Sequence, residues 1–290
     1  MGGTKMRSAK KVRFVNNALV HTGLAVLAAV WVFPIFWVVM TSFRVEKGSY
    51  VSTFLPKALT LDNYRKLFTD TSILNFPQMF KNTLIIAVIS CLLTTAYVLM
   101  VSYCLSRLRF KLRKPYMNMA MVLGLFPSFM SMIAVYFILK AIGLTEGALI
   151  RVALILCYSG GAGLTFQIAK GFFDTIPKAI DEAALIDGCT RWQIFSRITL
   201  PLSRPVIIYT VLTSFIAPWV DFIFAKVICR ANSDQFTIAL GLWKMLDKEY
   251  IDSWYTSFAA GAVLISIPIA ILFLFPQRFY VDGISGAVKG

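Results

Sequence analysis

The residue types that could do chemistry are few in this chain, and their spacing excludes the common catalytic and metal-binding sets. The sequence has one histidine and five cysteines, and no two cysteines stand in CxxC spacing. No zinc site or disulfide framework is therefore predicted. The HExxH, GxSxG and GxxxxGK[ST] patterns are absent as well. We expect no catalytic residues, no metal and no cofactor on this chain.

Trp219 and Asp221 are the candidates for contact with a substrate, because they stand in an otherwise apolar stretch. A charge at membrane depth is costly and usually faces a cavity or a partner. A carboxylate beside an aromatic ring can hold the hydroxyls and the apolar ring face of a sugar. The alternative is that Asp221 forms an ion pair or hydrogen bond between neighbouring helices, and both interpretations stay open.

Residues 174–204 form a polar segment unlike the other connecting segments. Thr175 is expected to cap a short helix, with Pro177 in its first turn and Gly188 in the left-handed position that ends it. Thr190 is expected to cap a second short helix over 191–198, which Leu200-Pro201 would stop.

The first of these two helices has a narrow face of small and apolar residues. Such a face could enter a groove on another protein, with Glu182 offering a charge to the partner. The alternative is an amphipathic helix pair that lies on the membrane surface. Too few basic residues flank the segment for a lipid-binding face, which favours docking.

The composition predicts the kind of protein in which these residues are placed. Of the 290 residues 58% are hydrophobic and 15% charged, with a mean hydropathy of +0.72. Soluble domains are nearer 45–50% apolar and about 25% charged. We predict an all-α integral membrane protein with six transmembrane helices and a cytoplasmic coupling segment between the fourth and fifth. The spans are expected near 18–43, 83–105, 116–139, 149–173, 205–228 and 257–277.

The basic residues predict the orientation. Segments 1–17 and 106–115 each contain five basic residues and no acid. Such segments stay in the cytoplasm. Both termini and segment 174–204 are therefore expected there. The net charge of +15 is explained by topology, and no nucleic-acid partner is predicted.

The segment 174–204 also carries a family motif. Glu182-Ala183-Ala184, Gly188, Ile198 and Leu200-Pro201 match E-A-A-x(3)-G-x(9)-I-x-L-P in full. This resembles the EAA loop in the permease subunits of bacterial ABC importers. Further stretches resemble the MalG-type carbohydrate-uptake subfamily, and they are Phe54-Leu55-Pro56, 59–64, Phe80-x-Asn82-Thr83-Leu84, Trp219-x-Asp221-Phe222 and the tail 281–290.

The resemblance implies a division of labour among several proteins. Residues 1–17 would be a cytoplasmic segment, 18–280 the permease domain and 281–290 a cytoplasmic tail. Segment 176–200 would be seated on a cytoplasmic ATPase dimer, which holds ATP and magnesium. The tail residues Gly283, Gly286, Lys289 and Gly290 would reach the same ATPase. A second, homologous permease subunit and an extracytoplasmic sugar-binding protein would complete the system in the bacterial cytoplasmic membrane.

The function implied by the resemblance is import of a carbohydrate, such as a maltodextrin-like oligosaccharide. The alternative is a self-contained secondary transporter or channel for a small solute. Such a protein is expected to show internal repeats and relays of acids or histidines within its spans. The chain shows no clear repeat and essentially one acid at membrane depth, which favours the importer subunit.

Overall fold

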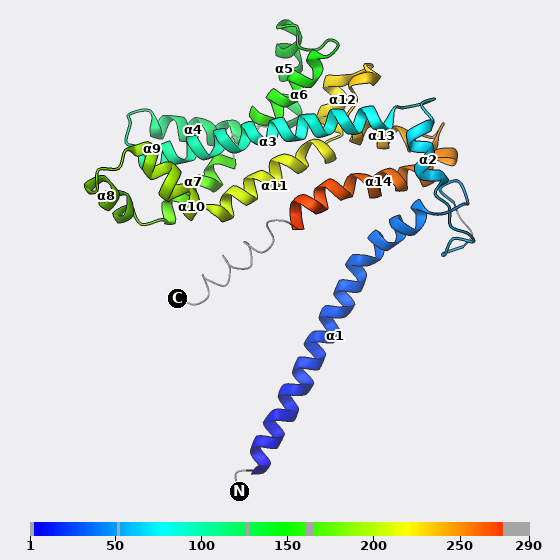
Figure 1. The fold of residues 1–290 in the computed structure, drawn as a ribbon, viewed down its shortest axis with the longest axis horizontal. Helices are drawn as coiled ribbons and strands as arrows, with labels where there is room; N and C mark the ends of the chain where they lie inside the picture. Colours follow the sequence, from blue (N-terminus) through cyan, green and yellow to red (C-terminus); the bar gives the residue numbers. More distant parts are fainter. Residues whose placement is uncertain (1–2, 51–52, 126–127, 161–164, 275–290) are drawn as a thin grey trace.

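The computed structural model describes residues 3–50, 53–125, 128–160 and 165–274, and these form a layer of helices from which one long helix departs (Figure 1). No strand occurs in these ranges, where the only extended pairing is a single bridge between Arg44 and Leu59. The elements are α1 (Gly3–Ser42), α2 (Asp62–Thr69), α3 (Phe76–Arg107), α4 (Arg113–Gly124), α5 (Ser128–Ala141), α6 (Leu149–Gly160), α7 (Thr165–Thr175), α8 (Lys178–Ile186), α9 (Arg191–Gln193), a π-helical turn (Ile194–Thr199), α10 (Leu200–Leu202), α11 (Arg204–Val220), α12 (Ile223–Cys229), a 3-10 turn (Ser233–Gln235), α13 (Ile238–Met245) and α14 (Ile251–Leu274).

Four helical segments in the described ranges are long and apolar enough to cross a membrane. They are Asn16–Ser42 in α1, all of α3, α14, and Leu149–Thr175, which combines α6 and α7 across residues 161–164 outside the described ranges. A fifth is reached if the helices Arg191–Leu202 and Arg204–Val220, which meet at 80°, are one bent span. An all-α membrane fold is confirmed, whereas the count of six spans stays a prediction.

Two predicted spans differ from the structure. Span 205–228 is not one helix, because α11 ends at Val220 and the backbone of Asp221 is extended. Pro218 lies within α11, and the Asp221 N–H still donates to the Ala217 carbonyl at 3.1 Å, so the helix passes the proline before it ends. Span 116–139 is described as two shorter helices, α4 and α5, and residues 126–127 between them lie outside the described ranges.

Span 149–173 begins at Leu149 as predicted, whereas the helices of spans 83–105 and 257–277 begin earlier than predicted. α3 begins at Phe76, where the Asn75 side chain accepts the Gln78 N–H and Pro77 occupies the first turn. α14 begins at Ile251, ahead of the predicted 257. Polar and turn-forming residues near these two helix starts lower the local hydropathy. The two predicted spans therefore begin too late.

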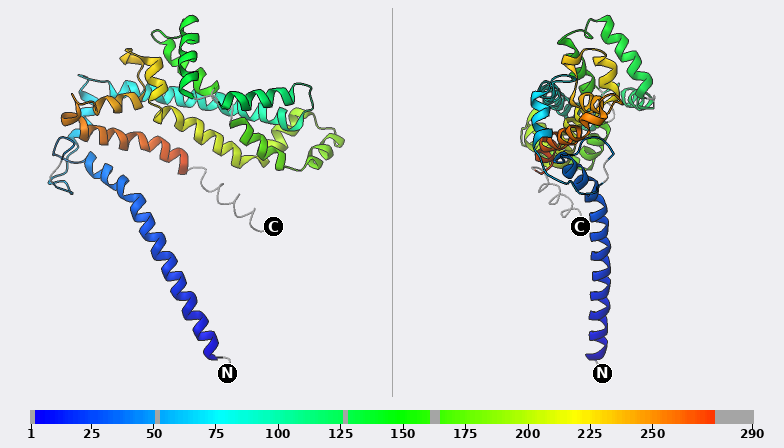
Figure 2. Two further views of the ribbon diagram at one scale, coloured as in Figure 1. Left: turned by 180° about the vertical axis from the view of Figure 1, so that it is seen from behind. Right: turned by 90° about the vertical axis from the view of Figure 1, so that its right-hand side faces the viewer.

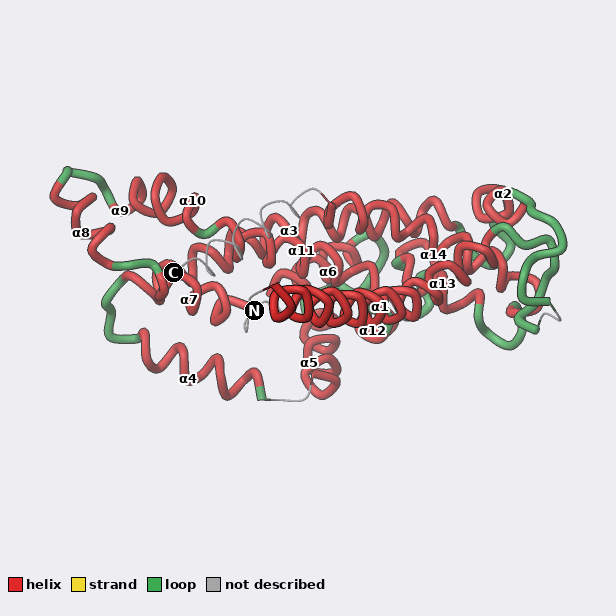
Figure 3. Tube along the Cα trace, turned by 90° about the horizontal axis from the view of Figure 1, so that it is seen from below, coloured by secondary structure: helices red, strands yellow, loops and turns green. Residues whose placement is uncertain are grey.

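α3 is the axis of the layer, because α6, α7 and α11 all pack on it. Viewed from below, α4 and α5 lie to one side of this layer (Figure 3). α1 meets the start of α14 and then projects away from every other helix (Figure 2). None of the most apolar part of α1 is buried in this chain.

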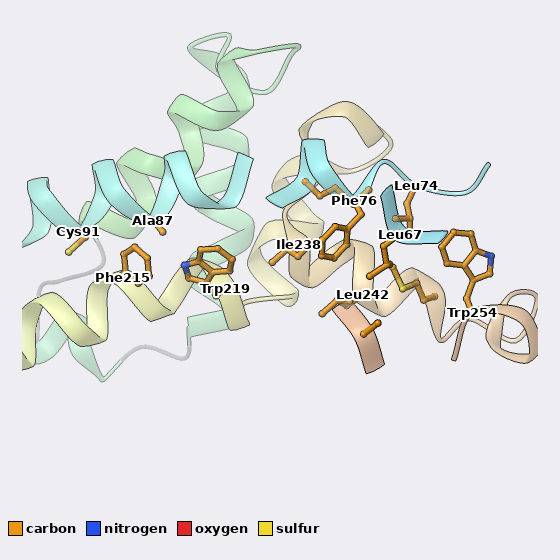
Figure 4. Close-up of a cluster of buried hydrophobic side chains, with 13 residues drawn as sticks. Leu67, Leu74, Phe76, Ala87, Cys91, Phe215, Trp219, Ile238, Leu242 and Trp254 are labelled. Carbon is orange, nitrogen blue, oxygen red and sulfur yellow. The ribbon is translucent and has the colours of Figure 1, made fainter. Parts of the chain in front are cut away.

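The core divides along α3. One cluster of buried side chains lies where α2, α13 and α14 meet, which we call the α2 end, and extends along α3 and α11 to Phe215 and Cys91 (Figure 4). Here Lys66 lies 3.9 Å from the centroid of the Trp254 ring, and burial lowers the pKa of this lysine. A second cluster, built on Phe166, Phe173 and Phe195, lies toward α8, which we call the α8 end. The third lies between α6 and α12.

Candidate functional site

The first helix of the polar segment is α8, and Gly188 ends it as predicted. Gly188 has φ +82°, a left-handed conformation that side chains rarely adopt. The N–H of Cys189 then turns back to the Ala184 carbonyl at 2.9 Å. The predicted cap is wrong, because the Thr175 hydroxyl donates to the Phe172 carbonyl at the end of α7. Pro177 itself precedes the helix, with an extended ψ of 130°.

The second helix begins as predicted and ends later. The Thr190 hydroxyl accepts the Gln193 N–H, and the Gln193 side chain accepts the Thr190 N–H, which makes a capping box. The helix does not stop at Leu200-Pro201 but continues through a π-helical turn and α10 to Leu202. In a regular α-helix the Pro201 ring would meet the carbonyl four residues earlier, and the wider turn before it relieves this clash.

A buried ion pair joins α8 to the end of α3. Arg107 Nε lies 3.2 Å from Asp181 Oδ2, and the two side chains are only 2% and 8% exposed. Arg107 Nη2 also donates to the Phe173 and Ile176 carbonyls, each at 2.9 Å. One guanidinium therefore ties together the last residue of α3, the end of α7 and the first turn of α8.

A second polar joint lies beside the first. The Ser106 hydroxyl donates to Asp174 Oδ1 at 2.6 Å, and Lys170 forms an ion pair with the other oxygen of the same carboxylate. Both joints escaped the sequence prediction, which counted Arg107 only among the basic residues of segment 106–115. In the structure Asp181 and Ala184, three residues apart, form the buried face of α8.

The EAA motif therefore divides between two faces of α8. Ala184 is buried against the rest of the chain, whereas Glu182 and Ala183 are exposed. Ile186 is 87% exposed, and Trp192 on α9 is 66% exposed. Further along, Ile198 and Leu200 are half-buried and Pro201 is exposed. Because large apolar side chains seldom stand open on a polar segment, this face is typical of a protein contact.

Of the other predicted candidates, Trp219 lies in the packed interior and Asp221 is half-buried. Trp219 is 1% exposed and lies among the buried apolar side chains of Figure 4. It packs edge-on against Phe80, with 5.2 Å between the ring centroids. Asp221 Oδ2 accepts the Tyr158 hydroxyl of α6 at 2.7 Å, and Oδ1 accepts the Phe224 N–H at 3.1 Å. Both carboxylate oxygens are thus engaged within the chain, which favours the helix-packing interpretation of Asp221.

Two further predictions concern the C-terminal tail and the absence of a metal site. Gly283, Gly286, Lys289 and Gly290 lie outside the described ranges. Within those ranges, no three histidine, cysteine or acidic side chains are grouped as a metal would require.

Comparison with known proteins decides the family. Residues 99–285, which include the whole polar segment, match the family described as the inner membrane component of binding-protein-dependent transport systems. The chain belongs to this family. This permease is 32% identical to the galactooligosaccharides transport system permease protein GanQ of Bacillus subtilis, over 96% of this chain and 97% of that protein. It is also 32% identical to the maltodextrin permease MdxG of the same organism, over 98% and 100%.

The solved structures show the same fold. A bacterial ABC transporter involved in import of the acidic polysaccharide alginate has a chain that matches with a TM-score of 0.75 at 20% identity, over 94% of the permease and 98% of that chain. A second structure of an alginate transporter, in complex with a periplasmic protein that carries an alginate pentasaccharide, matches with a TM-score of 0.66 at 18% identity, over 92% and 97%. Family and helices together make the permease a multi-pass membrane protein and a translocation subunit.

Proposed function

We propose that this chain is one of two homologous permease subunits of an ATP-driven importer that carries an oligosaccharide across the bacterial cytoplasmic membrane. An extracytoplasmic binding protein delivers the sugar, and a cytoplasmic ATPase dimer supplies the energy. The names of the relatives support this proposal, since GanQ and MdxG serve oligosaccharides and an alginate transporter shares the fold. Both termini lie in the cytoplasm, where the tail residues Gly283, Gly286, Lys289 and Gly290 contact the ATPase.

The observation that carries the mechanism is the two-faced character of α8. Its outer face presents Glu182, Ala183 and Ile186 to a partner. On its inner face, Asp181 holds the buried guanidinium of Arg107. A push on the outer face therefore reaches α3 through a short, buried connection and not through a flexible loop. The permease has two arrangements, and the ATPase favours one of them by binding it more tightly.

The middle of the membrane domain supports a role for Asp221 in this movement. The carboxylate links α6 to the break between α11 and α12. If these helices separate during transport, the carboxylate and the neighbouring Trp219 become available to a sugar. Asp221 thus stabilises one arrangement and contacts substrate in the other.

Reconstitution tests the proposal. The complete set of two permeases, ATPase and binding protein is placed in liposomes, and uptake of labelled maltodextrin, galactooligosaccharide and alginate oligosaccharide is measured with and without ATP. We expect uptake of one of these sugars only with ATP, binding protein and both permeases. Transport by this chain alone, without an ATPase, would contradict the proposal and support a self-contained transporter.

A further inference from the structure

The connection between α3 and α4 encloses a basic hollow that the proposed function does not use. It is an open cavity of about 430 Å³, lined by Arg109, Phe110, Lys111, Arg113, Lys114 and Met117. We call it the basic hollow. Four of its six lining residues are cations and the other two are apolar.

The cations of the basic hollow are little neutralised by the described part of the chain, where Arg113 lies near enough to Asp174 to interact with its carboxylate. Within the described residues, none of the four is in ion-pair distance of a carboxylate, whereas the nearby Arg107 and Lys170 are each paired. α4 begins at Arg113 and has no acid in its first turn, so the positive end of its dipole adds to the same field. The hollow therefore attracts an anion, and two arginines allow forked hydrogen bonds to a phosphate or carboxylate.

An apolar stripe begins where the hollow ends. Met117 lines the hollow, and Met121 follows it on the same face of α4. Leu125, which comes directly after the last residue of α4 and keeps a helical backbone, continues this face at the same spacing of four residues. Met121 is 55% and Leu125 83% exposed, and no residue of α4 is buried in this chain. Figure 3 shows α4 at the side of the helical layer, with its start toward the α8 end.

We propose that the basic hollow binds the phosphate headgroup of an anionic phospholipid, with an acyl chain along the stripe formed by Met117, Met121 and Leu125. The hollow lies where the apolar span of α3 ends, at the level where headgroups meet a membrane protein. The rule that keeps basic loops in the cytoplasm requires charges but neither a hollow nor an adjoining apolar stripe. A free phosphate would use the cations and leave the stripe without a role.

Lipid binding to the purified complex tests this proposal. The complex of both permeases and the ATPase, in a nonionic detergent, is titrated with phosphatidylglycerol or with phosphatidylcholine that has the same acyl chains. Retained lipid is counted by native mass spectrometry. We expect phosphatidylglycerol to bind at least about tenfold more tightly, because each cation near a membrane surface contributes on the order of a factor of five.

Variants then locate the site. Lys111→Gln with Arg113→Gln removes two cations from the hollow and keeps enough basic residues for topology, and should weaken phosphatidylglycerol binding about tenfold or more. Lys81→Gln with Lys140→Gln removes the same charge from exposed positions on α3 and α5 and should leave this binding unchanged. The comparison of the two lipids on the unchanged complex does not depend on how any variant folds.

Four results would overturn the proposal. They are equal binding of the two lipids, undiminished binding by the hollow variant, displacement of the lipid by an equal concentration of inorganic phosphate, and loss of the lipid when the ATPase joins the permeases. The third would assign the hollow to a free anion, and the fourth to the partner protein. None of these results depends on whether the complex imports a sugar.

Discussion

The α2 end and the α8 end of this permease are held together by different kinds of contact. At the α2 end, Asn63 is buried and donates to the Ser42 and Arg44 carbonyls, at 3.0 and 2.7 Å, and accepts the Thr256 hydroxyl at 2.8 Å. The buried guanidinium of Arg44 lies at the same end and donates to the neutral carbonyls of Thr53 and Phe54, at 3.0 and 2.6 Å, without a carboxylate in ion-pair distance among the described residues. At the α8 end there are ion pairs instead: Arg107 pairs with Asp181 of α8, and Lys170 pairs with Asp174, while Ile186 on α8 is exposed.

This difference indicates that the two ends have different tasks. Hydrogen bonds to neutral carbonyls inside an apolar core fix one arrangement at modest cost. A buried ion pair adds little net stability but is very costly to break, so it keeps two elements together while they move. We infer that the α2 end is a rigid cap and that α8 is a lever attached to α3 at one point.

The largest effect is expected from removing the charge of Asp181. Asp181→Asn leaves Arg107 buried without its counter-charge, and breaking such a pair costs about 3–5 kcal/mol. We expect sugar uptake per ATP hydrolysed to fall at least tenfold in reconstituted liposomes, while the assembled complex can still be purified.

Asp187→Asn is the matched control, because Asp187 follows α8 by one residue and is exposed. It should change uptake little. If the two substitutions have equal effects, or if Asp181→Asn lowers only the yield of complex and not the uptake per ATP, the contrast between the ends is wrong.

A smaller effect is expected at the α2 end, where a substitution should lower the Tm and leave uptake unchanged. Asn63→Ala leaves two carbonyls and a hydroxyl buried without this partner, at a cost of about 3 kcal/mol. The Tm of the complex should fall, while uptake per folded complex stays unchanged. Asn232→Ala, at an exposed position, should alter neither quantity. A loss of coupling without a loss of Tm in Asn63→Ala would remove the distinction between cap and lever.

The helices between the two ends supply a third test. Tyr158→Phe removes the hydroxyl that donates to Asp221 without touching the carboxylate, and a hydrogen bond to a charged group contributes about 2 kcal/mol. If Asp221 serves only helix packing, Tyr158→Phe and Asp221→Ala should lower Tm and uptake in parallel. If Asp221 also meets the sugar, as we propose, Asp221→Ala should raise the KM for uptake and Tyr158→Phe should not.

The smallest effect is expected at the turn after α8. Gly188→Val places a branched side chain in a left-handed conformation, at about 1–2 kcal/mol, although its Cβ would meet no atom within 4 Å. Uptake should fall while membrane insertion is unchanged. Gly188→Asn should retain uptake, because asparagine tolerates this conformation. Normal uptake with valine would contradict the docking geometry.

Features of the fold and the site that depend on neighbouring residues could be predicted from the sequence, whereas features that depend on distant residues could not. Gly188 and the Thr190 cap were predicted correctly, because a turn and a capping box involve neighbouring residues. The family followed from a motif with fixed spacing. The Arg107–Asp181 pair was missed, because a contact across 74 positions leaves no local pattern. The break at Asp221 was missed because its neighbours are as apolar as a continuous span.

The contact between α8 and the ATPase can be measured directly by photo-crosslinking in the membrane. A photoreactive amino acid replaces Ile186, which is 87% exposed, and in a second sample replaces the buried Ala184. The account predicts an adduct between the first sample and the ATPase subunit, and adducts of the second sample with this permease alone. If position 186 reacts only with lipid while the ATPase is present and active, α8 is not the lever that we describe.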